Sequence, residues 1–358
     1  FRAHFLSIPV FPSFLGFELT KSRQNRETWN LLEKFTPQIQ QEYWEKIQPR
    51  FFDLPIEDKI YVLEKLMSVK RYFTVLDTTA MFAEEIPPKI IADLLRKAAL
   101  EKSIDDFRVV DPWDIEKLFE TLDQSRKIGR DKIAELEWLY LPILASEGSE
   151  RPPKMLHQEL STNPEFFAEV IKYVYKPKNE SKDEEREELP QELKKQRARL
   201  AWQLLDTWKT IPGSDISGRI DYQKLKSWVD KARDICIKLN RLEDCDKHIG
   251  QVLAYAVPDE DGNWPPEEVC RIIDEIQSKE LESGFGNGIL YSERKVFAKS
   301  PFEGGTQERA LAERYRKHAE KLSTAFPKTA SILRRIAESY ELEARREDEE
   351  AEKNKLEW

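Results

Sequence analysis

The sequence predicts an all-α fold, an irregular HEAT-like (α-solenoid-like) array of about fourteen helices. Apolar residues recur at spacings of three and four along most of the 358 residues, which is the periodicity of helices with one buried face. Charged residues make up 35% of the chain, enough to cover the opposite faces. Glycine accounts for only 12 residues, which is few for the turns of a sheet protein of this length.

Prolines mark where the expected helices begin. Proline fits the first position of a helix because the N–H group that it lacks would have no partner there. Thr36, Asp111 and Asn163 each precede such a proline, and we expect each to accept an N–H bond of the first turn. The prolines followed by helical periodicity are Pro37, Pro55, Pro88, Pro112, Pro164, Pro190, Pro265 and Pro327.

Each expected helix carries an apolar stripe that faces a core, since such a stripe is core far more often than a ligand-binding surface. The distances between helix starts are irregular, so the chain has no strict repeat. In chain order the stripes lie in residues 56–63, 91–95, 115–122, 166–174, 200–208, 225–232, 249–256, 269–276 and 332–340.

Composition divides the chain into six segments. Residues 176–189 are too polar to bury and are expected to form an exposed linker between two helical arrays. Residues 283–305 hold five of the twelve glycines and are expected to form a long irregular loop. The segments are residues 1–24 (N-terminal apolar segment), 25–175 (N-terminal helical array), 176–189 (charged linker), 190–282 (C-terminal helical array), 283–305 (Gly-rich loop) and 306–358 (basic helical hairpin with a charged tail).

Charge and cysteine content restrict the class of protein. The net charge of −9 argues against a globally basic nucleic-acid binder, although a local basic surface remains compatible with it. The chain has three cysteines and no CxxC pair, which favours the reducing cytoplasm over a disulfide framework. No run approaches the ~18 apolar residues of a transmembrane helix, so we expect no membrane contact.

The first residues are apolar and aromatic, but Arg2, His4, Pro9 and Pro12 interrupt them. They lack the clean apolar centre and small-residue cleavage site of a signal peptide. We expect the chain to be the tail of a longer polypeptide, with residues 1–17 packed on the part that precedes them. A trimmed free N-terminus is the alternative.

Four stretches resemble the C-terminal helical region of large, multidomain bacterial proteins, mostly without assigned functions and some of them found among antiviral defence genes. The resemblance covers roughly residues 25 to 350. It implies a repeat-like regulatory or recognition region, with any enzymatic part upstream of Phe1, and it attaches no catalytic role to a residue. The stretches are Glu159–Pro177 (ELSTNPEFFAEVIKYVYKP), Leu205–Gly213 (LDTWKTIPG), Ile249–Pro266 (IGQVLAYAVPDEDGNWPP) and Gly304–Leu322 (GGTQERALAERYRKHAEKL).

Few residues have the spacing of a catalytic, cofactor or metal site. Cys245, Asp246 and His248 lie together, but zinc needs about four ligands, and Cys236 and Cys270 would reach them only through the fold. Buried free cysteines are the ordinary interpretation. The GFGNG run at residues 284–288 lacks the spacing of a dinucleotide fingerprint and the GK[ST] of a phosphate loop. We therefore expect no catalytic residue, cofactor or metal ion. If the chain were an enzyme, His248 and His318 would be the best acid–base candidates.

A basic stretch departs from the acidic background. Between Gly284 and Arg335, eleven basic residues outnumber five acidic ones, with aromatic residues interleaved in the expected glycine-rich loop. Such a surface is expected to contact an anion or a partner, or to dock on the acidic remainder of the same chain. The candidate contact residues are Arg294, Lys295, Arg314, Arg316, Lys317, Lys321, Arg334 and Arg335.

The sequence favours a non-enzymatic interaction, sensing or scaffold module of a larger bacterial protein, contacting a protein partner or other domains of its own chain. One alternative is a nucleic-acid-contacting sensor surface formed by residues 284–335. The other is an enzyme with a site near His248 or His318, which convergence of polar side chains in one deep pocket would favour.

Overall fold

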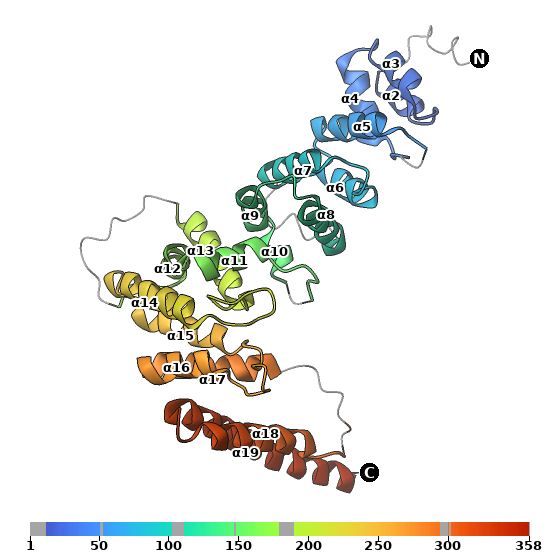
Figure 1. Ribbon diagram of the computed structural model, residues 1–358. Helices are drawn as coiled ribbons and strands as arrows, with labels where there is room; N and C mark the ends of the chain where they lie inside the picture. The colour runs from blue at the N-terminus through green and yellow to red at the C-terminus, as the bar shows by residue number, and fades with distance from the viewer. Residues whose placement is uncertain are drawn as a thin grey trace. The chain divides into compact units, whose positions relative to one another are not determined.

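A computed structural model describes residues 12–50, 53–101, 111–146, 148–178, 190–293, 300 and 302–357. Over these residues the chain consists of eighteen helices, with no strand beyond an isolated antiparallel bridge between Ser214 and Ile220. The predicted all-α class is therefore confirmed. The chain divides into two compact units, Phe1–Met155 and Leu156–Trp358 (Figure 1).

The first unit holds nine of the described helices, each packed mainly on helices close to it in the chain. They are α2 (Pro12–Leu19), α3 (Arg26–Leu32), α4 (Pro37–Lys46), α5 (Ile56–Ser68), α6 (Tyr72–Met81), α7 (Pro88–Glu101), α8 (Pro112–Ser125), α9 (Arg130–Leu139) and α10 (Leu141–Leu144).

The second unit follows the same rule of neighbour packing. Its helices, the first of which starts just before the boundary, are α11 (Lys154–Thr162), α12 (Pro164–Val174), α13 (Gln191–Thr207), α14 (Tyr222–Lys238), α15 (Leu242–Leu253), α16 (Glu267–Ile276), α17 (Lys279–Glu293), α18 (Thr306–Leu322) and α19 (Pro327–Glu357).

The proline signals located the helix starts well. Five helices begin at one of the predicted prolines, and Pro55 and Pro190 each stand immediately before a helix. Two of the three predicted caps form: Asp111 accepts from the Trp113 N–H, and Asn163 accepts from the Phe166 N–H. Thr36 makes no side-chain cap bond, so that prediction is wrong.

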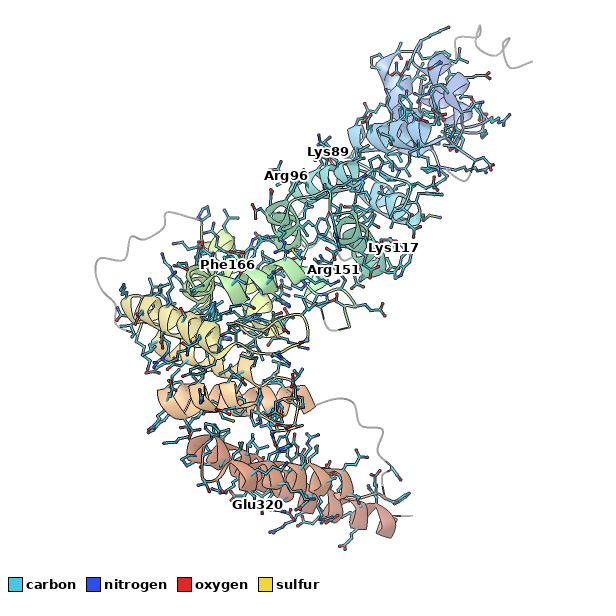
Figure 2. All side chains as sticks on the ribbon, viewed as in Figure 1. Lys89, Arg96, Lys117, Arg151, Phe166 and Glu320 are labelled. Atoms are coloured by element: carbon cyan, nitrogen blue, oxygen red, sulfur yellow. The ribbon has the colours of Figure 1, made fainter. Side chains whose placement is uncertain are left out.

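Arg151, labelled in Figure 2, has a fully buried side chain at the centre of an ion-pair cluster near the end of the first unit. Its guanidinium lies 2.5 Å from the carboxylate of Glu137, which is also fully buried, and 2.8 Å from that of Asp123. The same group lies 4.7 Å from the ring centroid of Phe119. A buried charge is tolerated only when paired in this way, so Arg151 fixes the segment after α10 against α8 and α9.

The prediction of an irregular loop at residues 283–305 is wrong over its first half, because α17 runs through Gly284, Gly286 and Gly288 to Glu293. The glycines serve close packing instead of a turn. A Cβ on Gly284 would lie 1.9 Å from the Lys247 carbonyl oxygen, and one on Gly250 of α15 would lie 2.0 Å from the Leu281 carbonyl oxygen. The backbones of α15 and α17 are thus in direct contact. Residues 294–299 and 301 lie outside the described residues.

Two other predictions differ from the structure. The expected linker at residues 176–189 falls inside the second unit, because α12 and α13 on either side of it pack together. Its described part, residues 176–178, is anchored by a bond from the Lys178 N–H to the Asn240 carbonyl, and residues 179–189 lie outside the described residues. The described residues form eighteen helices, whereas about fourteen were expected, because short helices such as α10, and the glycine-rich α17, have no clear apolar stripe.

The close approach of α15 and α17 can be tested with two alanine substitutions in one helix. Gly284→Ala is expected to lower the free energy of unfolding by about 2 kcal/mol or more, because the methyl group meets backbone atoms that cannot move separately. Gly286→Ala is the matched control, since its Cβ would meet only the Ile332 side chain, at 3.9 Å. It is expected to raise stability by about 0.5–1 kcal/mol through helix propensity.

Urea unfolding measures both free energies, and hydrogen exchange of peptides from α15 and α17 locates the effect. Equal stabilities of the two variants would contradict the glycine contact.

Candidate functional site

The structure separates the predicted basic contact residues into two groups. Arg314, Arg316 and Lys317 lie on α18, which forms an antiparallel pair with α19 (Figure 1). Arg316 reaches Glu341 on α19. Arg334 and Arg335 of α19 lie closer to the turn that joins the two helices, near the end of α18 that carries Lys321. Seven residues separate positions 334 and 341, which is about 10 Å along a helix. Arg294 and Lys295 lie outside the described residues.

Acidic side chains of the same unit contact much of this basic surface. Arg316 pairs with Glu313 at 2.9 Å and with Glu341 at 3.5 Å, and Lys317 lies 3.6 Å from Glu313. Arg335 reaches Glu282 of α17 at 3.1 Å. Arg314 lies over the Tyr315 ring, 4.8 Å from its centroid. Lys321 and Arg334 are exposed. Among the predicted contact residues that the structure describes, Arg316, Lys317 and Arg335 therefore have acidic partners, and the basic side chains do not form one unpaired patch.

The described histidines take part in core packing. His157 lies 3.2 Å from the Thr207 hydroxyl, and the Tyr175 hydroxyl lies 2.8 Å from Nε2 of His248. Burial, with a contribution from the charge of Lys247, lowers the pKa of His248 to about 4. The pKa of His318 is also lowered, by partial burial and by Arg314 and Lys321. His4 lies outside the described residues.

The three cysteines are free and buried. The thiol of Cys236 forms a hydrogen bond with that of Cys245, which together with burial raises the pKa of Cys245. Burial raises the pKa of Cys270 to about 12. Thiols with raised pKa values in a core are unreactive. No group of three or more His, Cys, Asp or Glu side chains in the described part of the chain is arranged to hold a metal ion.

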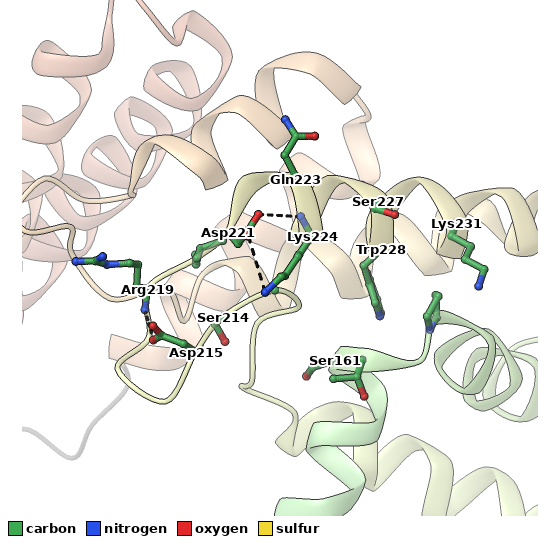
Figure 3. A pocket seen from close by; sticks show the side chains of 14 residues that line it. Ser161, Ser214, Asp215, Arg219, Asp221, Gln223, Lys224, Ser227, Trp228 and Lys231 are labelled. Carbon is green, nitrogen blue, oxygen red and sulfur yellow. Dashed lines mark hydrogen bonds and ion pairs between the residues drawn. The ribbon is translucent and has the colours of Figure 1, made fainter.

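Polar side chains do converge in a cleft of the second unit that the sequence did not reveal (Figure 3). The cleft has a volume of about 990 Å³ and lies between the α11–α12 corner, the loop from α13 to α14, and the first turns of α14. We call it the α14 cleft. Its lining consists of Ser161, Thr162, Pro164, Gly213, Ser214, Asp215, Arg219, Ile220, Asp221, Gln223, Lys224, Ser227, Trp228 and Lys231.

Short-range hydrogen bonds set the α11–α12 corner of the cleft. Asn163 caps α12 and donates from its amide to Glu159, one turn back on α11, at 2.7 Å. The Ser161 hydroxyl lies 2.6 Å from the Thr210 carbonyl oxygen and accepts a 3.0 Å bond from the indole N–H of Trp208. The corner is therefore tied to the end of α13 and to the loop that follows it.

The loop between α13 and α14 is shaped by one glycine and two aspartates. Gly213 has φ of +76°, and a Cβ there would lie 2.8 Å from the Leu225 N, so the position requires glycine. Asp215 accepts bonds from the backbone N–H groups of Ser217 and Arg219 at 2.8 and 3.1 Å. Hydrogen bonds, above all from the Ser217 hydroxyl, lower its pKa. Asp221 caps α14 by accepting from the Lys224 N–H.

Trp228 forms part of the cleft wall and also belongs to the core. Its side chain is 6% exposed and packs on Phe167 and Trp208, with ring centroids 5.1 and 5.8 Å away. Figure 3 shows the indole extending from α14 toward the segment that carries Ser161. The indole N–H is buried and has no hydrogen-bond partner among the described residues. Such a group normally finds a partner, since leaving it unpaired costs about 1–3 kcal/mol.

Comparison with known proteins gave no match to a protein-family model, a curated protein or a solved structure. The resemblance to bacterial multidomain proteins therefore stays a prediction. Across the described helices, none is long and apolar enough to span a membrane.

The sequence contains partial signals for the cleft. The run PGSDISGRID at residues 212–221 combines turn residues with a helix cap, and Trp228 belongs to the apolar stripe expected at residues 225–232. Nothing local shows that this loop faces the corner at Ser161, some fifty residues earlier in the chain.

The burial of His248 predicts a specific loss of stability in acid. Its pKa is about 4 in the folded protein and about 6.5 in the unfolded chain, so the neutral form favours folding. This contribution is fully present above about pH 6.5 and is lost as the pH falls toward 4, by about 2–3 kcal/mol at pH ~4.5.

Urea unfolding at about pH 7 and pH 4.5 measures the effect in the wild type and in His248→Gln. The wild type is expected to lose more stability than the variant. An equal loss would show that His248 is not the buried neutral group described above.

Proposed function

We propose that this chain is a non-enzymatic interaction or scaffold module whose α14 cleft receives a segment of a partner protein or of another domain of its own polypeptide. The observation that carries the proposal is the cleft itself. It is an open cleft of about 990 Å³ that presents hydroxyl, amide and charged groups from three separate parts of the unit. Neither His248 nor His318 lines it, so it is not the deep pocket at those histidines that would favour an enzyme. Protein-recognition surfaces likewise combine apolar and polar groups, and here Pro164, Ile220 and Trp228 supply the apolar part of the lining.

The helical framework supports the same proposal. Helices that pack on their chain neighbours, as they do within each unit, resemble HEAT-like arrays, which function by presenting surfaces to partners. The proposal therefore includes a solenoid-like arrangement of the helices within each unit.

The alternatives have weaker support. A nucleic-acid surface on α18 and α19 would need basic side chains without acidic partners, whereas Arg316, Lys317 and Arg335 form ion pairs within the unit. A catalytic role for His248 would need an accessible ring, and its side chain is 6% exposed. His318 is partly buried against Trp264, with ring centroids 5.9 Å apart.

Peptide selection on the purified chain tests the proposal. Random peptides of about twelve residues, selected for binding to the wild type, are expected to bind Ser227→Trp at least about tenfold more weakly, because an indole at this exposed lining position fills the cleft. Asp234→Trp is the matched control, since it adds the same side chain at an exposed position of α14 outside the lining.

Fluorescence anisotropy of the labelled peptides measures each affinity. Unchanged binding to Ser227→Trp, or failure to select any peptide, would contradict the proposal. Salt-sensitive binding of a labelled single-stranded polynucleotide that Arg334→Glu abolishes would favour the nucleic-acid alternative instead.

A further inference from the structure

We propose, on the basis of the proposed function, that the α14 cleft binds an acidic, extended segment of a partner protein. Lys224 and Lys231 hold carboxylates of this segment on either side of Trp228. Four features of the cleft support this chemistry. They are the spacing of the lysines, the hydrogen bonds of the aspartates, the weak pairing of the lysines, and the buried donor of Trp228.

The first feature is the spacing along α14. Lys224, Trp228 and Lys231 stand at positions i, i+4 and i+7, which share one face of a helix. The two lysines are therefore about 10 Å apart along the axis. In a polyproline II segment, residues three apart lie on the same side at about 9.3 Å. The spacing fits two carboxylates at positions i and i+3 of an extended ligand.

The second feature is that the carboxylates of the cleft already have partners. Asp215 accepts from the Ser217 hydroxyl at 2.6 Å as well as from two backbone N–H groups. Asp221 accepts the first-turn bond of α14 at 3.1 Å. These acids serve the local turns, and the lining also presents the ammonium groups of Lys224 and Lys231 to a ligand.

The third feature is that the two lysines are only weakly held. The Lys224 ammonium is 3.9 Å from the Asp221 carboxylate, and its side chain is 74% exposed. Lys231 pairs with Glu165 at 2.6 Å, but both side chains are more than half exposed. An exposed pair of this kind is weakened by solvent, so exchanging Glu165 for a carboxylate of the ligand costs little free energy.

The fourth feature is a buried donor between the lysines. The Trp228 indole N–H lies in the wall of the cleft and has no partner among the described residues, which leaves an unsatisfied donor beside the two lysines. The net charge of the whole chain is −9, which repels an acidic ligand overall. Binding of such a ligand therefore depends on these local groups.

Two defined peptides test the acidic specificity. One is a fluorescein-labelled peptide with two glutamates three residues apart in a proline- and alanine-rich background, and the other has glutamine at both positions. The glutamate peptide is expected to bind the full chain about tenfold more tightly than the glutamine peptide. Its affinity is expected to fall as salt concentration rises.

Substitutions identify the residues that recognise the charge. Lys224→Gln and Lys231→Gln are each expected to weaken binding of the glutamate peptide about threefold. Lys238→Gln serves as the control, because Lys238 is exposed on the same helix but outside the lining. Circular dichroism checks that each variant remains helical.

The outcomes separate this inference from the proposed function. If the glutamate peptide binds no more tightly than the glutamine peptide, or binds both cleft-lysine variants as it binds the wild type, acidic recognition is wrong. The proposed function still stands in that case if library-selected peptides lose affinity for Ser227→Trp. If those peptides bind Ser227→Trp normally, the cleft is not the interaction site and both proposals fail.

Discussion

Contact among three aromatic rings is the constraint on which the cleft depends. Phe167 of α12, Trp208 at the end of α13 and Trp228 of α14 have ring centroids 5.1–5.8 Å from one another. Trp208 also donates to the Ser161 hydroxyl, which links the rings to the α11–α12 corner. Because the cluster joins all three walls, the distance across the cleft is set by ring packing, with the flexible lysines only at its edge.

A second contact, between the backbones of α15 and α17, fixes the helices that follow. Gly250 on one helix and Gly284 and Gly288 on the other leave no room for a Cβ. Helix α17 also contacts α19. The start of α19 is capped by Asp274 of α16, whose carboxylate accepts from the N–H groups of Lys328 and Thr329. The surface of α18 and α19 is thus supported by glycine packing and a cap, while the cleft is supported by aromatic packing.

Sequence alone located most of the helices, because prolines, caps and apolar stripes are local signals. It missed features that depend on partners distant in the chain. Gly284 and Gly288 looked like turn residues because nothing near them indicates that Gly250 lies opposite. The acidic partners of the excess positive charge around Arg316 and Arg335 could not be identified from the sequence, because Glu341 and Glu282 reach it only through the fold. The cleft was missed for the same reason, since its walls come from three separated stretches.

The central claim is that the second unit binds a protein segment in the α14 cleft. Hydrogen exchange of the full chain, measured by mass spectrometry with and without a library-selected peptide, tests this claim most directly. Slower exchange is expected in the α11–α12 corner, in the loop at residues 213–221 and in the first turns of α14, which together line the cleft. Slower exchange confined to α18 and α19, with none at the cleft, would contradict the account.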